Sequence, residues 1–318
     1  MISREIDKNT DFKALELPKG WVFYVIAQDE KPLYSGISAR LLGRLNSFSQ
    51  RAQDDKLIDE MMERANFLSY EELDNSFAAL VLQKCFVMDN LPEYQNRILP
   101  WENYVYLGLD SHRFPFVSIE EHTNDDWQYI GPFRSRFFLA EMMDTISRIL
   151  KLPHCETGSY PCDKFDRDIC RGWCLELLPS QESSTAHDLD KLDSLLKEAW
   201  MHPNNGVLEM VQNERDAYFN DLEFIKADLL DDEIELLSGY RDWLNFLYVA
   251  KDLNLETDDF LIRNGQLLEA RLGSRYYHFP ADFPEYRPNE TLALPLAKCD
   301  EMKIIYDYIR ELNNASKA

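Results

Sequence analysis

Apolar residues in the first hundred positions alternate or cluster in short runs, which predicts a small sheet with helices around it. Residues 21–26 (Trp-Val-Phe-Tyr-Val-Ile) are aromatic and β-branched, as is typical of a strand. A polar turn over 28–32 leads to a second strand that ends in Tyr34-Ser35-Gly36, so the two strands predict a hairpin. A third strand is expected at 66–70. Apolar residues at helical spacing predict three helices, at 39–48, 55–64 and 71–89.

The rest of the chain continues with short strands and amphipathic helices. Strands are expected at 114–118, 127–130, 260–263, 267–272 and 276–279. Helices are expected at 134–151, two or three times within 186–253, and at 297–313. The chain has no run of eighteen apolar residues and no apolar N-terminal segment, so we expect neither a membrane span nor a secretory signal.

The 318 residues are long enough for several domains, and 45% of them are hydrophobic, which is enough for a real core. A polar stretch at 181–185 is typical of a domain boundary. We expect a first domain at 1–102, a linking segment with four cysteines at 103–180, a helical region at 181–255 and a small β/α region at 256–318.

Four of the six cysteines fall within twenty residues: Cys155, Cys162, Cys170 and Cys174. Thiolates are soft ligands, and four of them can hold zinc or an iron–sulfur cluster. The paired C-x2-C pattern of zinc fingers is absent, so the residues alone leave open zinc, a cluster, or reduced thiols packed as small apolar groups. Cysteines gathered in this way favour a reducing environment over a disulfide framework, so we expect a cytoplasmic protein.

Acidic residues outnumber basic ones by 57 to 34, which gives a formal net charge of −23. Proteins that bind nucleic acid over a broad surface usually carry a basic face. Any contact of this chain with DNA is therefore expected to be weak and local, helped by a metal or a basic partner, or lost altogether.

Several motifs, in the same order, resemble the N-terminal half of the excinuclease subunit UvrC. The hairpin at 22–36, with tyrosines ten residues apart, and the stretch at 40–45 resemble a GIY-YIG nuclease domain. Pro92-Glu93-Tyr94 resembles the Pro-x-Tyr-Asn end of that domain. Further stretches that resemble UvrC lie at 110–117, 129–133, 161–174 and 221–234, so that the resemblance covers about residues 18–250.

The resemblance implies an α+β fold, in which a small GIY-YIG domain with a three-stranded antiparallel sheet precedes the cysteine segment, the helical region and the C-terminal β+α part. It implies a role in bacterial nucleotide excision repair, with a UvrB-like helicase subunit or another repair protein as the partner. It also implies a 4Fe–4S cluster, with zinc as the alternative, at four cysteines: Cys155, Cys162, Cys170 and Cys174.

GIY-YIG hydrolysis uses a tyrosine that attacks or activates water, an arginine that neutralises charge and a glutamate that anchors Mg²⁺. By position in the motif, Tyr24 and Tyr34 match the two tyrosines and Arg44 matches the helix arginine. Arg40 and Arg44 are the nucleic-acid contacts that the resemblance implies. The position of the metal-binding glutamate falls on Gln83.

Three substitutions predict that this site is catalytically silent. The amide of Gln83 is a poor sole ligand for a hard cation, which puts a bound Mg²⁺ in doubt. Ile37 replaces a lysine of the phosphate pocket, and Phe48 replaces a third tyrosine. The alternative is a displaced metal ligand among Glu71, Glu72 and Asp74, which would otherwise form a solvated start of a helix.

The stretch at 221–234 resembles the UVR helix pair that docks UvrB. The residues expected to bind a partner are Leu222, Phe224, Ala227 and Ile234. The same apolar spacing would also suit the core of an ordinary helical hairpin, and Asp231-Asp232 stands where the family has an Arg-Asp pair.

Two functions from different classes remain. The first is a repair-associated binding protein that is deficient in DNA incision. The second is an active GIY-YIG endonuclease whose metal is held by a displaced acid.

Overall fold

The structure is a computed structural model that describes all residues except 125–126, 153–161, 175–188, 203–205 and 316–318. It is a mixed α+β protein, and its described residues include three four-stranded sheets. The chain divides into two compact units. The first unit consists of Met1–Glu102, Ala250–Phe283 and Ala297–Ala318, and the second unit consists of Asn103–Val249 and Pro284–Leu296.

The sheet of the first unit has four antiparallel strands in the order β1-β4-β2-β3. The expected hairpin is confirmed as β2 (Val22–Gln28) and β3 (Lys31–Ser38), and the third expected strand as β4 (Phe67–Glu72). The prediction of three strands is wrong, because β1 (Ile2–Glu5) adds a fourth at the edge. All four residues of β1 are exposed, so this strand carries no alternation that would reveal it.

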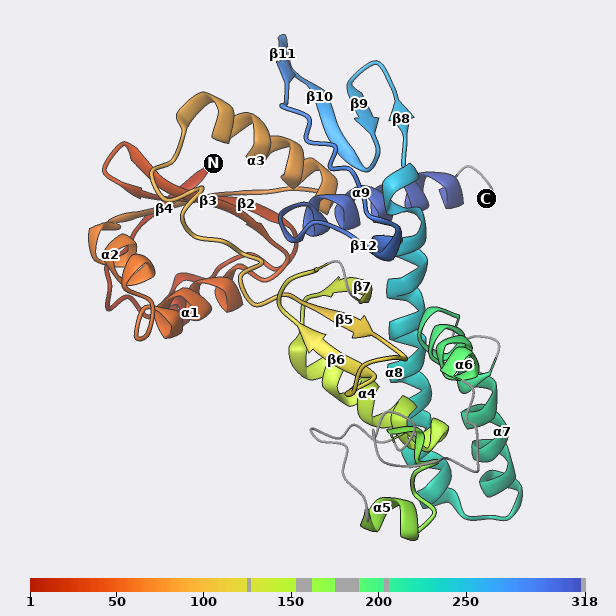
Figure 1. Cartoon of the computed structure of the whole chain (residues 1–318). Helices are drawn as coiled ribbons and strands as arrows, with labels where there is room; N and C mark the ends of the chain where they lie inside the picture. Colours follow the sequence, from red (N-terminus) through yellow and green to blue (C-terminus); the bar gives the residue numbers. More distant parts are fainter. Residues whose placement is uncertain (125–126, 153–161, 175–188, 203–205, 316–318) are drawn as a thin grey trace. The chain divides into compact units, whose positions relative to one another are not determined.

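Alternate residues of β2 serve two different cores, as the two-residue repeat of a strand requires. Val22, Tyr24 and Ile26 face one core together with helices α1 (Leu41–Arg51) and α2 (Lys56–Arg64). Phe23 and Val25 face the opposite side, where Leu82 and Phe86 of helix α3 (Ser76–Asn90) pack against them. The sheet therefore lies between α1 and α2 on one side and α3 on the other (Figure 1).

The C-terminal part of the chain completes the first unit by covering the outer side of α3. Its antiparallel sheet has the order β11-β10-β9-β8. Its elements are the 3-10 turn Ala250–Asp252, β8 (Leu255–Glu256), β9 (Phe260–Arg263), β10 (Gln266–Leu272), β11 (Arg275–His278) and α9 (Leu296–Ala315). Phe77, Leu80 and Val81 of α3 share a buried core with Ile262 and Ile305 of this part. Helix α3 is thus enclosed on two sides.

The second unit has its own sheet, in the order β12-β7-β5-β6, and five helices among its described residues. The strands are β5 (Val105–Leu109), β6 (Val117–Glu120), β7 (Gln128–Phe133) and β12 (Leu292–Ala293). The helices are α4 (Arg136–Leu150), α5 (Asp163–Asp166), α6 (Leu189–Met201), α7 (Val207–Asn220) and α8 (Phe224–Val249). Within this part, α8 is the long helix that pairs with α7 in a hairpin (Figure 1). None of the described helices has the length and hydrophobicity that crossing a bilayer requires.

Candidate functional site

The four residues assigned from the motif to a hydrolytic site line one cavity of the first unit, with a volume of about 420 Å³. Tyr24 comes from β2, Tyr34 from β3, Arg44 from α1 and Gln83 from α3. Residues from four separate elements therefore meet at the place that the sequence motif predicts.

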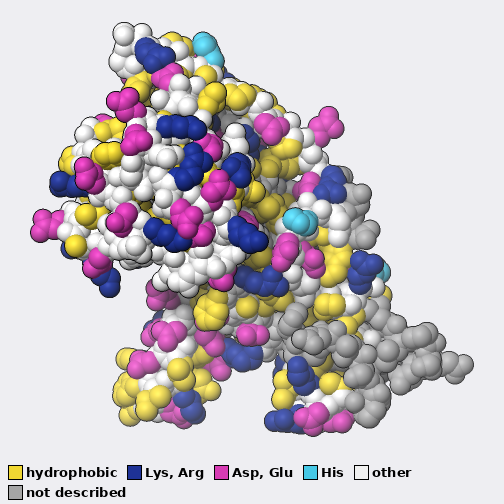
Figure 2. Space-filling view, turned by 90° about the vertical axis from the view of Figure 1, so that its left-hand side faces the viewer, with side chains coloured by type: hydrophobic (Ala, Val, Ile, Leu, Met, Phe, Trp, Pro, Cys, Tyr) yellow, Lys and Arg dark blue, Asp and Glu magenta, His cyan; other side chains and the backbone are white. Residues whose placement is uncertain are grey.

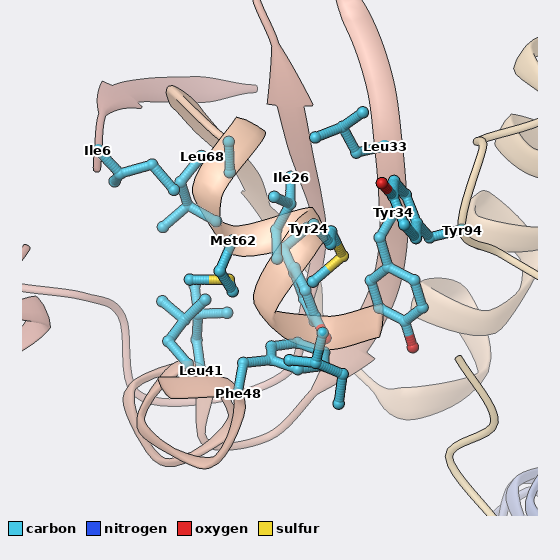
Figure 3. Packing of buried hydrophobic residues seen from close by; sticks show 14 of the residues in the cluster. Ile6, Tyr24, Ile26, Leu33, Tyr34, Leu41, Phe48, Met62, Leu68 and Tyr94 are labelled. Carbon is cyan, nitrogen blue, oxygen red and sulfur yellow. The ribbon is translucent and has the colours of Figure 1, made fainter. Parts of the chain in front are cut away.

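Close packing determines the position of the two tyrosines. Tyr24 is opposite Gly36 across the strand pair, and a Cβ atom on Gly36 would lie 2.5 Å from the Tyr24 hydroxyl oxygen. The ring centroids of Tyr24 and Tyr34 are 6.4 Å apart, and Phe48 meets Tyr34 edge to face at 5.5 Å. In Figure 3 the two hydroxyl groups lie at the same end of the cluster as the ring of Phe48.

Burial changes what these phenols can do. Tyr24 is 1% exposed, and the loss of solvent raises its pKa well above the ordinary value, as it also raises the pKa of Tyr34. The positive charge of Arg44 acts in the opposite direction on both groups without cancelling the effect of burial. Both hydroxyls therefore stay protonated at neutral pH and serve as hydrogen-bond donors rather than as bases.

Arg44 is half-buried, and its guanidinium makes no ion pair or side-chain hydrogen bond with any described residue. Arginine usually finds a carboxylate or another acceptor when it leaves water, because its five donors need partners. A guanidinium without a partner at a cavity wall is a feature that an anionic ligand would satisfy.

Gln83 and Gln95 both bind the backbone of Ser35. The amide nitrogen of Gln83 donates to the Ser35 carbonyl oxygen at 3.2 Å, and the amide nitrogen of Gln95 donates to the same oxygen at 3.1 Å. The Oε1 atom of Gln95 accepts from the Ser35 nitrogen and hydroxyl at 3.0 and 2.9 Å. The neutral side chain at the expected metal position is therefore engaged in holding β3.

The Pro92-Glu93-Tyr94 motif binds the start of β3, at Lys31 and Leu33. Glu93 receives two hydrogen bonds from Arg64, at 2.6 and 3.0 Å, and one from Lys31 at 2.5 Å. The hydroxyl of the buried Tyr94 donates to Glu60 at 2.6 Å, and the Tyr94 backbone nitrogen donates to the Leu33 carbonyl oxygen at 2.8 Å. This part of the motif has a structural role next to the cavity.

The opposite wall of the cavity comes from the C-terminal part of the chain, which sequence reasoning did not connect to the site. Its lining residues are Phe279, Pro280, Ala297, Lys298, Asp300, Glu301 and Ile304. The Nζ atom of Lys84 lies 2.6 Å from Oε1 of Glu301, which also accepts from the Leu267 backbone nitrogen at 2.9 Å. No motif marks these residues. The contact between Lys84 and Glu301 joins positions 217 residues apart, and a local sequence pattern does not reveal a contact at that separation.

The acids that reach the cavity are not those expected from the sequence. Asp300 and Glu301 line it, whereas Glu71, Glu72 and Asp74 do not. Among the described residues, no three His, Cys, Asp or Glu side chains lie together so that they could hold a metal ion.

Arg40, the other expected nucleic-acid contact, is exposed at the start of α1 and lies outside the cavity lining. On the face shown in Figure 2, basic side chains are intermingled with acidic ones. Contact with DNA stays a prediction.

Of the four clustered cysteines, Cys155 lies outside the described residues. Cys162, Cys170 and Cys174 are half-buried, and the Gly172 backbone nitrogen donates to the Cys170 sulfur at 3.2 Å. Cys162 directly precedes the short helix α5. Ligation by all four thiols stays a prediction.

The residues expected to bind a partner divide between the surface and the interior of the α7–α8 hairpin. Leu222 is 73% exposed and Phe224 is also exposed, whereas Ala227 is buried and Ile234 is half-buried. Three further exposed apolar neighbours were not among the residues expected to bind a partner: Phe219, Ile225 and Leu229. The Phe219 and Phe224 rings pack against each other at 5.4 Å. We call the five exposed residues the hairpin tip: Phe219, Leu222, Phe224, Ile225 and Leu229.

The fold and the cavity define a mixed α+β protein in which two tyrosines from a hairpin meet an arginine and a glutamine from helices. Comparison with curated proteins shows distant similarity over most of the chain to UvrABC system protein C, or UvrC.

The UvrC of Methanococcus maripaludis is 21% identical over 281 residues, which cover 85% of this chain and 51% of that protein. The UvrC of Vibrio vulnificus is 25% identical over 266 residues, which cover 78% of this chain and 42% of that protein. The UvrC of Methanothermobacter thermautotrophicus is 22% identical over 299 residues, which cover 85% of this chain and 50% of that protein. The chain therefore spans about half the length, or less, of these relatives. No protein-family model matches the chain, and no solved structure matches it.

Proposed function

We propose that this UvrC-related protein works in nucleotide excision repair by binding repair partners and that it does not cut DNA. The observation that carries the proposal is the amide of Gln83, which stands at the expected metal-anchor position and is hydrogen-bonded to Ser35. Magnesium binds through anionic oxygens in most protein sites, and an amide supplies no charge. Without an anchored cation, the leaving oxygen of a phosphodiester loses several kcal/mol of transition-state stabilisation.

The neighbouring ion pair supports the same conclusion. Glu301 is a carboxylate on the cavity wall, but the ammonium of Lys84 already neutralises it at 2.6 Å. A divalent cation would have to displace this ammonium and the hydrogen bond from the Leu267 nitrogen. Both side chains of the pair are largely buried, so the competition would occur away from bulk water, where ion pairs are stronger.

The C-terminal wall also supports a role without cutting. Phe77, Leu80 and Val81 of α3 pack into a core with Ile262 and Ile305. Separating this wall from α3 would expose that core to water, which costs about 25 cal/mol for each Å² of apolar surface. The wall is therefore a fixed part of the first unit, and it lines the same cavity as the two tyrosines.

The hairpin tip supports partner binding. Ile225 is 81% exposed, and the other four residues of the tip are also exposed apolar side chains. Exposed apolar side chains that lie together mark interaction surfaces more often than scattered single ones do. We propose that a UvrB-like helicase subunit or another repair protein docks here, with the cysteine block carrying an iron–sulfur cluster or zinc.

A second candidate function is an active endonuclease with a displaced metal ligand. The presence of Asp300 and Glu301 on the cavity wall favours it. These residues supply carboxylates to the site, and the motif residues of the cavity supply none. In this alternative the metal would replace the ammonium of Lys84.

A nicking assay separates the two functions. Purified protein is incubated with supercoiled plasmid and with a lesion-containing duplex, in Mg²⁺ or Mn²⁺, beside a Tyr34→Phe variant. We expect no nicking by either protein. Nicking by the natural sequence that is lost in Tyr34→Phe would overturn the proposal in favour of the endonuclease. Gln83→Glu is the matched variant that offers the missing carboxylate, and cutting gained by it alone would identify Gln83 as the cause of the silence.

A further inference from the structure

The charge inside the cavity of the first unit is opposite to that of the whole chain. Three basic residues line it, Arg44, Lys84 and Lys298, against two acidic ones, Asp300 and Glu301, so the lining carries a net charge of +1. The whole chain has a net charge of −23. Lys84 and Glu301 neutralise each other as an ion pair.

The remaining two cations come from two different helices, and Asp300 is the one other charged residue of the lining. Arg44 belongs to α1 and Lys298 to α9, and neither side chain makes an ion pair or side-chain hydrogen bond with any described residue. Both are half-buried. Two half-buried cations without a partner in one cavity attract an anion, and phosphate suits them because arginine binds it with two parallel hydrogen bonds and lysine as a point charge.

The rest of the lining suits a flat apolar group. The indole of Trp101 and the side chains of Val87, Met88 and Phe279 line the same cavity. Nucleobases stack on aromatic side chains in nucleic-acid-binding sites. The volume of about 420 Å³ lies in the range of small-molecule sites.

We propose that this cavity binds a nucleoside monophosphate, with its phosphate held by Arg44 and Lys298 and its base packed against Trp101. The protonated hydroxyl of Tyr34 is a further donor for a phosphate oxygen. The proposal goes beyond partner binding and does not depend on it, because the site belongs to the first unit and the hairpin tip to the second. A free nucleotide and the terminal nucleotide of a single strand share this chemistry.

Isothermal titration calorimetry with AMP, dTMP, inorganic phosphate and a 5′-phosphorylated single-stranded oligonucleotide tests the proposal on the full chain. We expect saturable 1:1 binding of the mononucleotides that is at least tenfold tighter than binding of phosphate. Arg44→Gln and Lys298→Gln should each weaken nucleotide binding roughly tenfold, as expected for loss of a charge-assisted hydrogen bond. Trp101→Leu should weaken the binding of AMP but not that of phosphate.

Arg271→Gln is the matched control, since it removes an exposed arginine of the first unit that does not line the cavity. It should leave nucleotide binding unchanged. Lys298→Gln keeps the test valid if thermal melting shows that Arg44→Gln disturbs the fold. Stronger binding of the oligonucleotide than of the mononucleotides, with the same loss in the variants, would identify a strand end as the source of the nucleotide. The proposal fails if no nucleotide binds, if phosphate binds equally well, or if Arg271→Gln weakens binding as much as Arg44→Gln does. The calorimetry measures neither nicking nor partner binding. A negative result would therefore refute nucleotide binding without refuting the proposed function.

Discussion

Tyr24 on β2 and Gly36 on β3 are direct cross-strand partners, and the Tyr24 hydroxyl occupies the space that a side chain at Gly36 would need. The glycine of the motif therefore provides room for a neighbouring phenol. The backbone freedom of glycine is not required at this position, because the φ angle of Gly36 lies outside the left-handed region.

We predict that Gly36→Ala lowers the free energy of unfolding by about 1–3 kcal/mol, the usual cost of overpacking a filled core. Urea denaturation followed by circular dichroism measures this change. Gly43→Ala is the control, because a Cβ atom at this helical position comes no closer than 3.9 Å to a neighbour. It should stabilise the protein by about 0.5–1 kcal/mol. Equal effects of the two variants would contradict this account of Gly36.

The ion pair between Lys84 and Glu301 joins α3 to the C-terminal wall, with 21% and 13% of the two side chains exposed. Lys84→Ala leaves the Glu301 carboxylate without its ammonium, and we expect a loss of about 1–3 kcal/mol in unfolding free energy. Lys8→Ala removes an exposed ammonium that pairs with Asp59 and Glu63, and it should cost less, because water screens exposed ion pairs. A similar loss in both variants by urea denaturation would argue against a special role for the pair in the cavity wall.

Acid should weaken the first unit through Glu93. Hydrogen bonds from Arg64, and then from Lys31, lower the pKa of this carboxyl from 4.5 to about 2. A carboxyl with a lowered pKa in the folded state stabilises the fold above the unfolded-state value and loses that contribution as pH falls toward the folded-state value. Stability should therefore decline between pH 4.5 and pH 2.

Glu93→Gln should flatten this part of the pH profile, measured as the urea midpoint at successive pH values. A shallower slope, and not its disappearance, is expected, because Arg287 lowers the pKa of Glu290 to about 2 in the second unit as well. An unchanged slope in Glu93→Gln would rule out the contribution of Glu93.

The cysteine block yields a spectroscopic prediction. If four thiolates hold an iron–sulfur cluster, anaerobically purified protein will be brown with broad visible absorption, and Cys170→Ser will remove most of that colour. Cys85→Ala, in the core of the first unit, should leave the absorption unchanged. A colourless protein with one zinc per chain would favour the alternative ligand, and a protein without metal would leave only reduced thiols.

The hairpin tip should carry partner affinity. Changing Ile225 and Leu222 together to Ser removes two of its most exposed apolar side chains and should weaken capture of a UvrB-like subunit at least tenfold. Leu272→Ser changes an exposed leucine on β10 in the first unit and should have no effect. Pull-down at moderate salt compares the variants. Undiminished capture by the double variant would place the contact elsewhere.

Local pattern was sufficient to predict the elements that build the tyrosine end of the site. Alternation along β2 places Tyr24 and Ile26 on one face of the sheet and Phe23 and Val25 on the other. Each pair packs into a different hydrophobic core. Arg44 and Gln83, which the motif groups with the two tyrosines, line the same cavity as they do.

The sequence could not predict the other half of the cavity. Phe279, Lys298 and Glu301 lie more than 240 positions after the hairpin, and neither alternation nor helical spacing encodes which surface such residues meet. Strand β1 was not predicted either. Its residues are exposed and show no apolar alternation, and the strand is held by backbone pairing with β4. In both cases tertiary contacts determine the outcome.

The enclosure of α3 between two parts of the chain affects the order in which the protein is assembled during its synthesis. When Glu102 leaves the ribosome, the outer side of α3 still lacks its cover, because the covering segment begins only at Ala250. At a translation rate of about 5–20 residues per second, that interval lasts on the order of 10–30 seconds. Throughout this time Phe77, Leu80 and Val81 lack their packing partners from the C-terminal part, and the nascent first unit cannot close before Ile305 has been made.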